Sequence, residues 1–250
     1  MTGTYRLAGL NIRIDSVYDR VHRLCAAYRI EDAAVDFCVE TDEADALFES
    51  ERTAREDVYT ASPKRHFSMP SLETLAVYRK IAERLPYYDA FLMHGSCLAV
   101  DGMSYLFTAK SGTGKSTHAR LWRETMGDRV VMVNDDKPLI RFVDGQPRAF
   151  GTPWDGKHRL SSNISVPLRA ICILTRGEQN RIVPINAYEG YPMLVQQIYR
   201  PLDGTAMVKT LALIDRICSA TALWRLECNM DPEAARVSYD AMKPKMNGES

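Results

Sequence analysis

Residues 109–116, Ala-Lys-Ser-Gly-Thr-Gly-Lys-Ser, have the types and spacing of a phosphate-binding loop, with alanine in place of the usual first glycine. Gly112 and Gly114 allow the backbone to curl so that successive N–H groups point at phosphate oxygens. Lys115 is spaced to reach the β- and γ-phosphates, and the Ser116 hydroxyl is a ligand for Mg²⁺. The alternative is a glycine-rich turn that precedes a helix by chance. We predict a nucleotide-phosphate site formed by Ser111, Gly112, Thr113, Gly114, Lys115, Ser116 and Thr117.

Two adjacent acids, Asp135 and Asp136, follow the apolar run Val-Val-Met-Val, twenty residues after Lys115. Phosphoryl transfer needs carboxylates against the metal and the attacking group. Neighbouring side chains on a strand point to different sides, so one acid can meet Mg²⁺ while the other faces the nucleophile. The alternative is a solvated turn, Asn-Asp-Asp-Lys. His94 lies in the apolar run before the loop, where its ring either faces the acids or is a structural histidine of the core.

Cationic side chains near a transferring phosphoryl group would stabilise its charge. Lys157, His158 and Arg159 follow Pro-Trp in a stretch where a mobile lid is expected; the equal alternative is a solvated basic loop. Arg176 and Arg181 flank an expected turn, and each is a candidate to point into the site; plain surface charge is the favoured interpretation of both. Trp154 either stacks on a ligand or packs on the core.

The elements around these residues predict an α/β protein with a small N-terminal lobe, residues 1–65, and a catalytic domain, residues 66–250. The lobe has strand character over 5–14 and 33–40, and helical patterns over 16–28, with Ser16 as N-cap, and over 42–55. In the second part, a helix from Ser71 precedes a strand over 91–100, an Asp-Gly turn, a strand over 103–108, the loop and a helix over 117–126.

Hairpins rather than regular βαβ units follow the loop helix, so we expect a mixed, largely antiparallel sheet. Its further strands are expected at 129–133, which we take as a parallel neighbour of the strand before the loop, and at 138–143, 147–150, 168–175, 181–185 and 223–229. The segment 181–185 is taken as the partner of 168–175. Helices are expected at 188–199, at 205–220 and after Asp231-Pro232.

Composition limits the classes of partner. Thirty-two basic residues balance thirty-two acidic ones among 250, which gives no support to nucleic acid or an anionic membrane as partner. The chain shows no apolar run of membrane-spanning length and no signal-peptide pattern at its start. Its six cysteines form no Cys-x-x-Cys pair, which favours free thiols, a cytoplasmic location and no zinc site.

Three segments together, Met-His-Gly-Ser around His94, the loop, and Val-Asn-Asp-Asp ending at Asp136, resemble the catalytic domain of HPr kinase/phosphorylase and its relative phosphoenolpyruvate carboxykinase. The resemblance spans residues 90–230. The stretch Gly-Thr-Pro-Trp-Asp-Gly-Lys at 151–157, with Asn163 and residues 165–168, resembles a smaller group of uncharacterised HPr kinase-related proteins.

The resemblance implies a P-loop core of that family, ATP and Mg²⁺ as cofactors, and roles for single residues. Lys115 would contact the β- and γ-phosphates, and Ser116 would hold the metal. One acid would be the general base toward a hydroxyl and the other a metal ligand; we take Asp135 as base and Asp136 at the metal, with His94 supporting the pair. The chain is too short for the whole carboxykinase, and residues 174–178 lack the second glycine of the HPr kinase signature. Neither decarboxylation nor HPr as substrate is therefore expected.

The sequence thus favours a Mg²⁺-dependent kinase that transfers the ATP γ-phosphoryl group to a hydroxyl of a peptide, a protein or a small molecule. The alternatives are a nucleotide-binding regulatory module without turnover, and phosphorolysis or hydrolysis by the same site. The acceptor, the choice of ATP, GTP or pyrophosphate, and the oligomeric state are left open.

Overall fold

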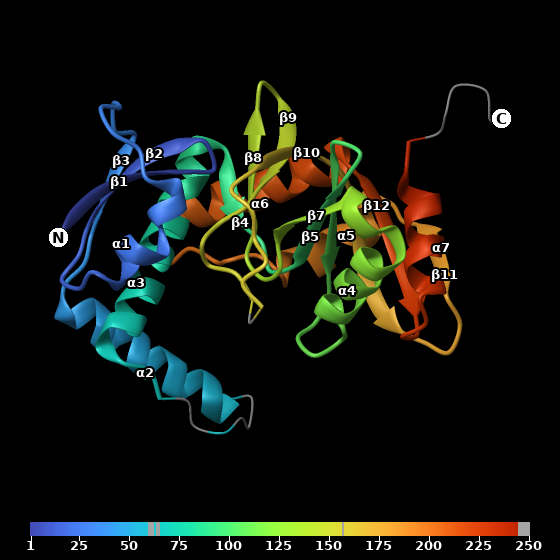
Figure 1. Ribbon diagram of the computed structural model, residues 1–250, viewed down its shortest axis with the longest axis horizontal. Helices are drawn as coiled ribbons and strands as arrows, with labels where there is room; N and C mark the ends of the chain where they lie inside the picture. The colour runs from blue at the N-terminus through green and yellow to red at the C-terminus, as the bar shows by residue number, and fades with distance from the viewer. Residues whose placement is uncertain (60–62, 64–65, 157, 245–250) are drawn as a thin grey trace. The chain divides into compact units, whose positions relative to one another are not determined.

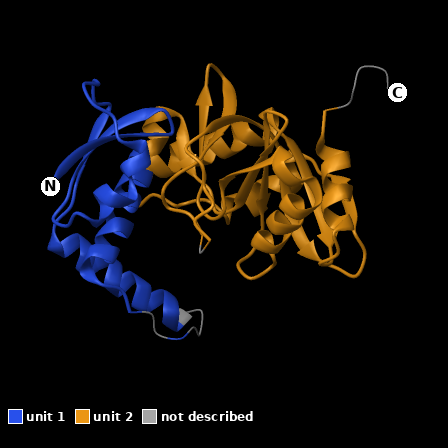
Figure 2. Ribbon diagram, in the orientation of Figure 1, with its two compact units in different colours: residues 1–84 blue, residues 85–250 orange. Residues whose placement is uncertain are grey.

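A computed structural model of the protein describes residues 1–59, 63, 66–156 and 158–244. The chain forms two compact units, Met1–Arg84 and Leu85–Ser250 (Figure 2). Each unit has its own sheet and its own buried apolar side chains.

The first unit is a three-stranded sheet with helices. Strands β1 (Thr2–Leu7) and β2 (Leu10–Asp15) form an antiparallel hairpin, and β3 (Phe37–Glu40) pairs parallel to β2. Alternate residues of the hairpin are buried, as a strand with one covered face requires. The helical elements are α1 (Arg20–Leu24), η1 (Ala26–Tyr28), α2 (Glu43–Tyr59) and α3 (Met69–Arg84).

Three sequence predictions change in this unit. The strand character over 5–14 belongs to two strands, because Ala8 (φ 52°) and Gly9 (φ 72°) make a tight turn. The helix expected from Ser16 to 28 is two short pieces, and the Ser16 hydroxyl donates to the Tyr18 carbonyl instead of capping a helix. Helix α3 belongs to this unit, because buried Glu73 accepts hydrogen bonds from the backbone N–H groups of Val17 (2.7 Å) and Tyr18 (2.9 Å). The division of the chain therefore follows Arg84, later than the boundary that the sequence suggests at 65.

The second unit is built on a nine-stranded mixed sheet (Figure 1). Its main path has the order β4-β8-β9-β10-β6-β5-β7, and β12 pairs with both β10 and β11. Among the strand pairs of this sheet in the described residues, only β10/β6 and β10/β12 are parallel, so the sheet is largely antiparallel, as the sequence predicts. The strands are β4 (Ala90–Leu92), β5 (Ser96–Val100), β6 (Met103–Thr108), β7 (Val130–Asn134), β8 (Leu139–Val143), β9 (Gln146–Phe150), β10 (Ser165–Arg176), β11 (Arg181–Pro184) and β12 (Ala222–Cys228).

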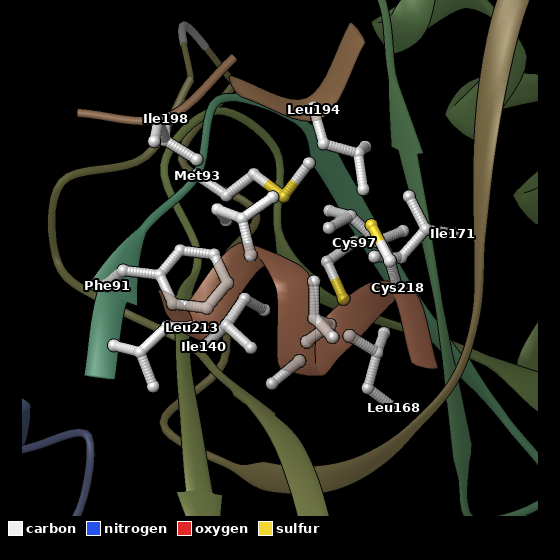
Figure 3. Packing of buried hydrophobic residues seen from close by; sticks show 14 of the residues in the cluster. Phe91, Met93, Cys97, Ile140, Leu168, Ile171, Leu194, Ile198, Leu213 and Cys218 are labelled. Atoms are coloured by element: carbon white, nitrogen blue, oxygen red, sulfur yellow. The ribbon is translucent and has the colours of Figure 1, made fainter. Parts of the chain in front are cut away.

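Helices cover two faces of this sheet. They are η2 (Leu85–Tyr88), α4 (Lys115–Met126), η3 (Gly127–Arg129), α5 (Ala187–Val195), α6 (Gly204–Ala220) and α7 (Glu233–Met242). One buried cluster joins the sheet to α5 and α6, with Phe91, Met93, Leu194 and Leu213 among its members (Figure 3). A second cluster joins the sheet to α4 and α7 around Trp122. Alternate residues of β10 divide between the clusters, which explains its almost continuous apolar sequence.

Three strand predictions differ from the observed pairing. The strand expected over 91–100 is interrupted at residues 93–95, between β4 and β5. Strand β11 pairs with β12 and not with β10. Strand β7 runs in the direction of β6, but β5 lies between them, since β5 is antiparallel to both.

Candidate functional site

Residues 109–114, which we call the glycine loop, connect β6 to α4, the strand–loop–helix order that the sequence predicts. Gly112 (φ 79°) and Gly114 (φ 121°) adopt backbone angles that L-residues rarely take. Gly114 is the N-cap of α4, which begins at Lys115, two residues earlier than expected. Ala109 is buried and has no positive φ, so a side chain fits at the position where the usual pattern has glycine.

Three backbone carbonyls of the glycine loop accept hydrogen bonds from the loop itself or from α4. The Lys110 carbonyl accepts from Thr113 N–H (3.2 Å), the Gly114 carbonyl from His118 N–H (2.9 Å), and the Ala109 carbonyl from Lys115 Nζ (3.0 Å). The first N–H groups of α4 have no carbonyl partner within the helix, and they carry its positive dipole end. This combination is suited to an anion.

Asn134, the last residue of β7, directs the two acids that follow it. Its buried amide oxygen accepts from the N–H groups of Asp136 (2.9 Å) and Lys137 (2.6 Å), and its nitrogen donates to the Thr152 hydroxyl (3.0 Å). The chain therefore turns at Asp135, and the two carboxylates have different neighbours, Ser96 for Asp135 and His94 for Asp136.

Asp135 is the more buried acid and lies beside Ser116. Its Oδ1 accepts from the Ser96 hydroxyl at 2.8 Å, and its residue surface is 8% exposed. Burial raises the pKa of Asp135, while hydrogen bonding from Ser96 and Ser116 and the nearby His158 act in the opposite direction. Gly156 lies against the same carboxylate, since a Cβ built there would stand 3.1 Å from Oδ2.

Asp136 is half-buried and lies beside His94. His94 Nε2 is 3.6 Å from Asp136 Oδ1, and Lys137 Nζ is 3.5 Å from Oδ2. Burial, and then the charge of Lys115, lowers the pKa of His94, and Asp136 opposes the shift. The structure thus brings His94, Lys115 and Asp136 together.

The break between β4 and β5 puts His94 in this position. His94 N–H donates to the Gln197 carbonyl (2.7 Å), and Gly95 N–H donates to the Asp136 carbonyl (3.0 Å). The Thr108 hydroxyl donates to the His94 carbonyl at 2.8 Å. A Cβ at Gly95 would stand 2.8 Å from the Phe107 carbonyl oxygen, so this close approach to β6 requires glycine.

One hollow borders the glycine loop, and a second lies along α4 from Ser116 onward. The first, of about 300 Å³, lies toward the ends of β6, β10 and α5 and includes Thr113, Arg176 and Gln197 in its lining. The other, of about 450 Å³, lies along α4 on the Asp135 side. Its lining residues are Ser116, Thr117, Arg120, Arg123, Met132, Asp135, His158 and Leu160.

The three residues of the expected lid, Lys157, His158 and Arg159, differ in where the structure places them. Lys157 lies outside the described residues. His158 is exposed and lines the larger hollow, whereas Arg159 is exposed, has a φ of 49° and is not part of that lining. Trp154 is buried (6% exposed), so of its two alternatives the structure has the ring packed into the protein.

Four residues of the site were missed or given little weight from sequence. Ser96, Asn134 and Gly156 were not singled out, although Asn before two acids is a recognisable turn signal. Arg176, for which surface charge was favoured, donates to the glycine loop carbonyls of Gly112 (2.5 Å) and Thr113 (3.3 Å). Arg181 is exposed on β11.

The donor set fits Mg²⁺ held jointly with phosphates. Mg²⁺ prefers oxygen ligands and is commonly bound by one or two carboxylates together with substrate phosphates. Asp135 and Ser116 supply a carboxylate and a hydroxyl in one hollow. Within the described part of the chain, no three His, Cys, Asp or Glu side chains form a cage that would hold a metal alone.

Comparisons with known proteins identify a family and include a distant structural likeness. The family model described as "SynChlorMet cassette protein ScmC" matches residues 62–211, which is 150 of the 250 residues. No curated protein matches. A structure of the Hpr(Ser) kinase/phosphatase from Coxiella burnetii is 15% identical over 50% of this chain and 96% of that chain, with a TM-score of 0.27. That score is too low for residue roles to be transferred. No helix of the described residues is long and apolar enough to cross a membrane.

Proposed function

This chain belongs to the ScmC family, and we propose that it is a Mg²⁺-dependent phosphotransferase with a P-loop core, which transfers the γ-phosphoryl group of ATP to a hydroxyl of a peptide or a small molecule. One observation carries the proposal: a glycine-rich loop leads into a helix whose first residues, Lys115 and Ser116, lie near two adjacent carboxylates, one of which has a histidine beside it. An anion site beside paired acids is the arrangement that phosphoryl transfer uses.

Residues 111–117 would bind the nucleotide phosphates. The N–H groups at the start of α4 would face the bound anion, and Lys115, the first residue of α4, would add a positive charge beside them. Lys115 Nζ bonds the Ala109 carbonyl in this structure, so it would exchange that bond for phosphate oxygens. Burial lowers the pKa of Lys115, and the charges of Asp136 and Asp135 act in the opposite direction.

The geometry favours an assignment of the acids opposite to the one we took from the resemblance. Asp135 shares a hollow with Ser116, so these two would hold Mg²⁺, which when bound offsets the negative charge of the transferring group. Asp136 is less buried and has His94 3.6 Å away. We assign Asp136 to accept the proton of the acceptor hydroxyl, and His94 to hold that carboxylate in place.

Paired acids favour transfer over a nucleotide sensor, because ordering one metal needs a single carboxylate. Phosphorolysis or hydrolysis would use the same residues, so the products have to separate these reactions. The partners we propose are a nucleotide and a hydroxyl-bearing substrate.

The test is ³¹P NMR of the protein with Mg-ATP, with and without an extract of small molecules and peptides. We expect an extract-dependent phosphomonoester signal from the wild type. We also expect loss of ATP binding in Lys115→Ala but not in Lys110→Ala, which removes the same charge five residues earlier, inside the glycine loop. Asp136→Asn is expected to bind Mg-ATP and to lose at least about a hundredfold in transfer rate. Asp135→Asn is expected to shift the Mg²⁺ dependence to higher concentration.

Three outcomes would contradict the proposal in different ways. Tight ATP binding by Lys115→Ala would reject the phosphate site. ATP bound but unchanged under every condition would favour the sensor. Release of inorganic phosphate without any extract, at the rate seen with it, would favour hydrolysis.

A further inference from the structure

We infer that Arg176 is a positioning residue that locks the glycine loop in its anion-binding shape; the inference rests on the proposed function of that loop. Its guanidinium donates from Nη2 to the Gly112 carbonyl at 2.5 Å and from Nε to the Thr113 carbonyl at 3.3 Å. Both acceptors are backbone atoms of the loop, more than sixty positions away in sequence. Among the described residues, no carboxylate forms an ion pair with Arg176, so its charge is directed at the loop.

Strand pairing brings this side chain to the loop. Arg176 is the last residue of β10, which runs parallel to β6, the strand that leads into the loop. Both strands therefore end at the same edge of the sheet. The end of β10 is fixed on its other side, because Gly177 N–H donates to the Cys228 carbonyl at 3.0 Å.

Holding the carbonyls fixes the direction of the N–H groups. In a trans peptide the C=O of one residue points opposite to the N–H of the next. When Arg176 holds the Thr113 carbonyl, the N–H of Gly114 in the same peptide unit must point the other way. A cation on the carbonyl end also polarises the unit, which strengthens that N–H as a donor.

The loop needs such a restraint because two of its residues are glycines with positive φ. Glycine has the largest conformational freedom of any residue, so a loop with Gly112 and Gly114 has many competing shapes. The neighbouring carbonyls of Ala109, Lys110 and Gly114 have donors from the loop and from α4. Arg176 supplies the donors for Gly112 and Thr113, which would otherwise have none from the loop itself.

The test compares full-length Arg176→Gln, Arg176→Lys and the wild type, with Arg181→Gln as a control that removes an exposed arginine from the next strand. Two quantities are measured: amide hydrogen exchange over residues 110–116 without nucleotide, and the affinity for Mg-ATP. We expect Arg176→Gln to speed exchange in the loop about tenfold and to weaken Mg-ATP binding by a similar factor, the loss typical of about one charge-assisted hydrogen bond. Arg176→Lys is expected to show exchange and affinity between those of Arg176→Gln and the wild type, since an ammonium cannot donate to both carbonyls as the guanidinium does. Arg181→Gln is expected to match the wild type.

The two readouts separate the possible failures. Unchanged loop exchange in Arg176→Gln overturns the inference; if affinity still falls, Arg176 contacts the phosphates directly. Faster exchange with wild-type affinity also overturns it, because the loop shape would then not matter for binding. Failure of the wild type to bind Mg-ATP would reject the proposed function, while the exchange measurement would still decide whether Arg176 orders the loop.

Discussion

Single polar side chains at strand ends shape the candidate site more than the acids themselves do. Asn134 is fully buried, accepts two backbone N–H groups and donates to Thr152. These bonds supply partners for the polar atoms of the buried Asn134 side chain, as buried polar groups require. Asn134 therefore both stabilises the end of β7 and fixes the directions of Asp135 and Asp136.

Replacing Asn134 with alanine is expected to lower the free energy of unfolding by about 1–3 kcal/mol, because buried donors and acceptors lose their partner. Phosphoryl transfer per folded molecule should also fall, since the acids lose their fixed directions. Thr152→Val is the matched control: it removes the hydroxyl partner of Asn134, together with that hydroxyl's bond to the Lys137 carbonyl, but keeps the Asn134 bonds to the Asp136 and Lys137 N–H groups. Urea unfolding and a transfer assay measure the two effects. Equal transfer by both variants, corrected for folded fraction, would contradict the directing role.

Helix α4 forms the candidate anion site with its first turn and packs against α7 with its buried side. His118 Nε2 lies 3.1 Å from the Ser238 hydroxyl oxygen, and Trp122 Nε1 donates to the same oxygen at 2.8 Å. Phe107 of β6 packs edge-on against both rings. The strand before the glycine loop and the helix after it are thus fixed by one aromatic cluster.

Burial lowers the pKa of His118 to about 4, from its usual value of 6.5. Between these two values the unfolded chain binds a proton that the folded chain does not, so the free energy of unfolding falls as pH drops from 6.5 to 4. The contribution of His118 to this loss is expected to be up to about 3 kcal/mol. Urea unfolding at several pH values measures it, with His118→Gln expected to show a shallower slope. Burial also lowers the pKa of His22, so His22→Gln serves as the comparison from the first unit. Identical slopes in wild type and His118→Gln would show that His118 does not titrate in this window.

At the scale of the whole molecule, local signals in the sequence predicted turns and single elements. They did not predict how some elements that are distant in sequence pack or pair. The Asp-Gly pairs at 101–102 and 144–145 form tight turns with positive φ at both residues, as predicted. The partner of β11 and the place of α3 in the first unit depend on surfaces formed by distant segments, which no local pattern encodes. The candidate site divides in the same way. The residues of the glycine loop are adjacent in sequence and could be recognised from it. Arg176 bonds the Gly112 carbonyl only because β10 lies beside β6.

The division after Arg84 predicts which truncated form of the protein folds by itself. Both buried clusters of the second unit are made of residues from 91 onward, so a piece with residues 85–250 keeps its complete core. We expect it to fold and to bind Mg-ATP within about threefold of the full chain. A piece with residues 66–250 retains α3 without α1, α2 and β3, the elements of the first unit that it contacts. We therefore expect the side chains of Leu72, Val77 and Ile81, which are buried in the full chain, to become open to water. Such an apolar face promotes association, so this longer piece is expected to elute as aggregate in size-exclusion chromatography. A monomeric, folded 66–250 beside an unfolded 85–250 would mean that α3 is structurally part of the second unit.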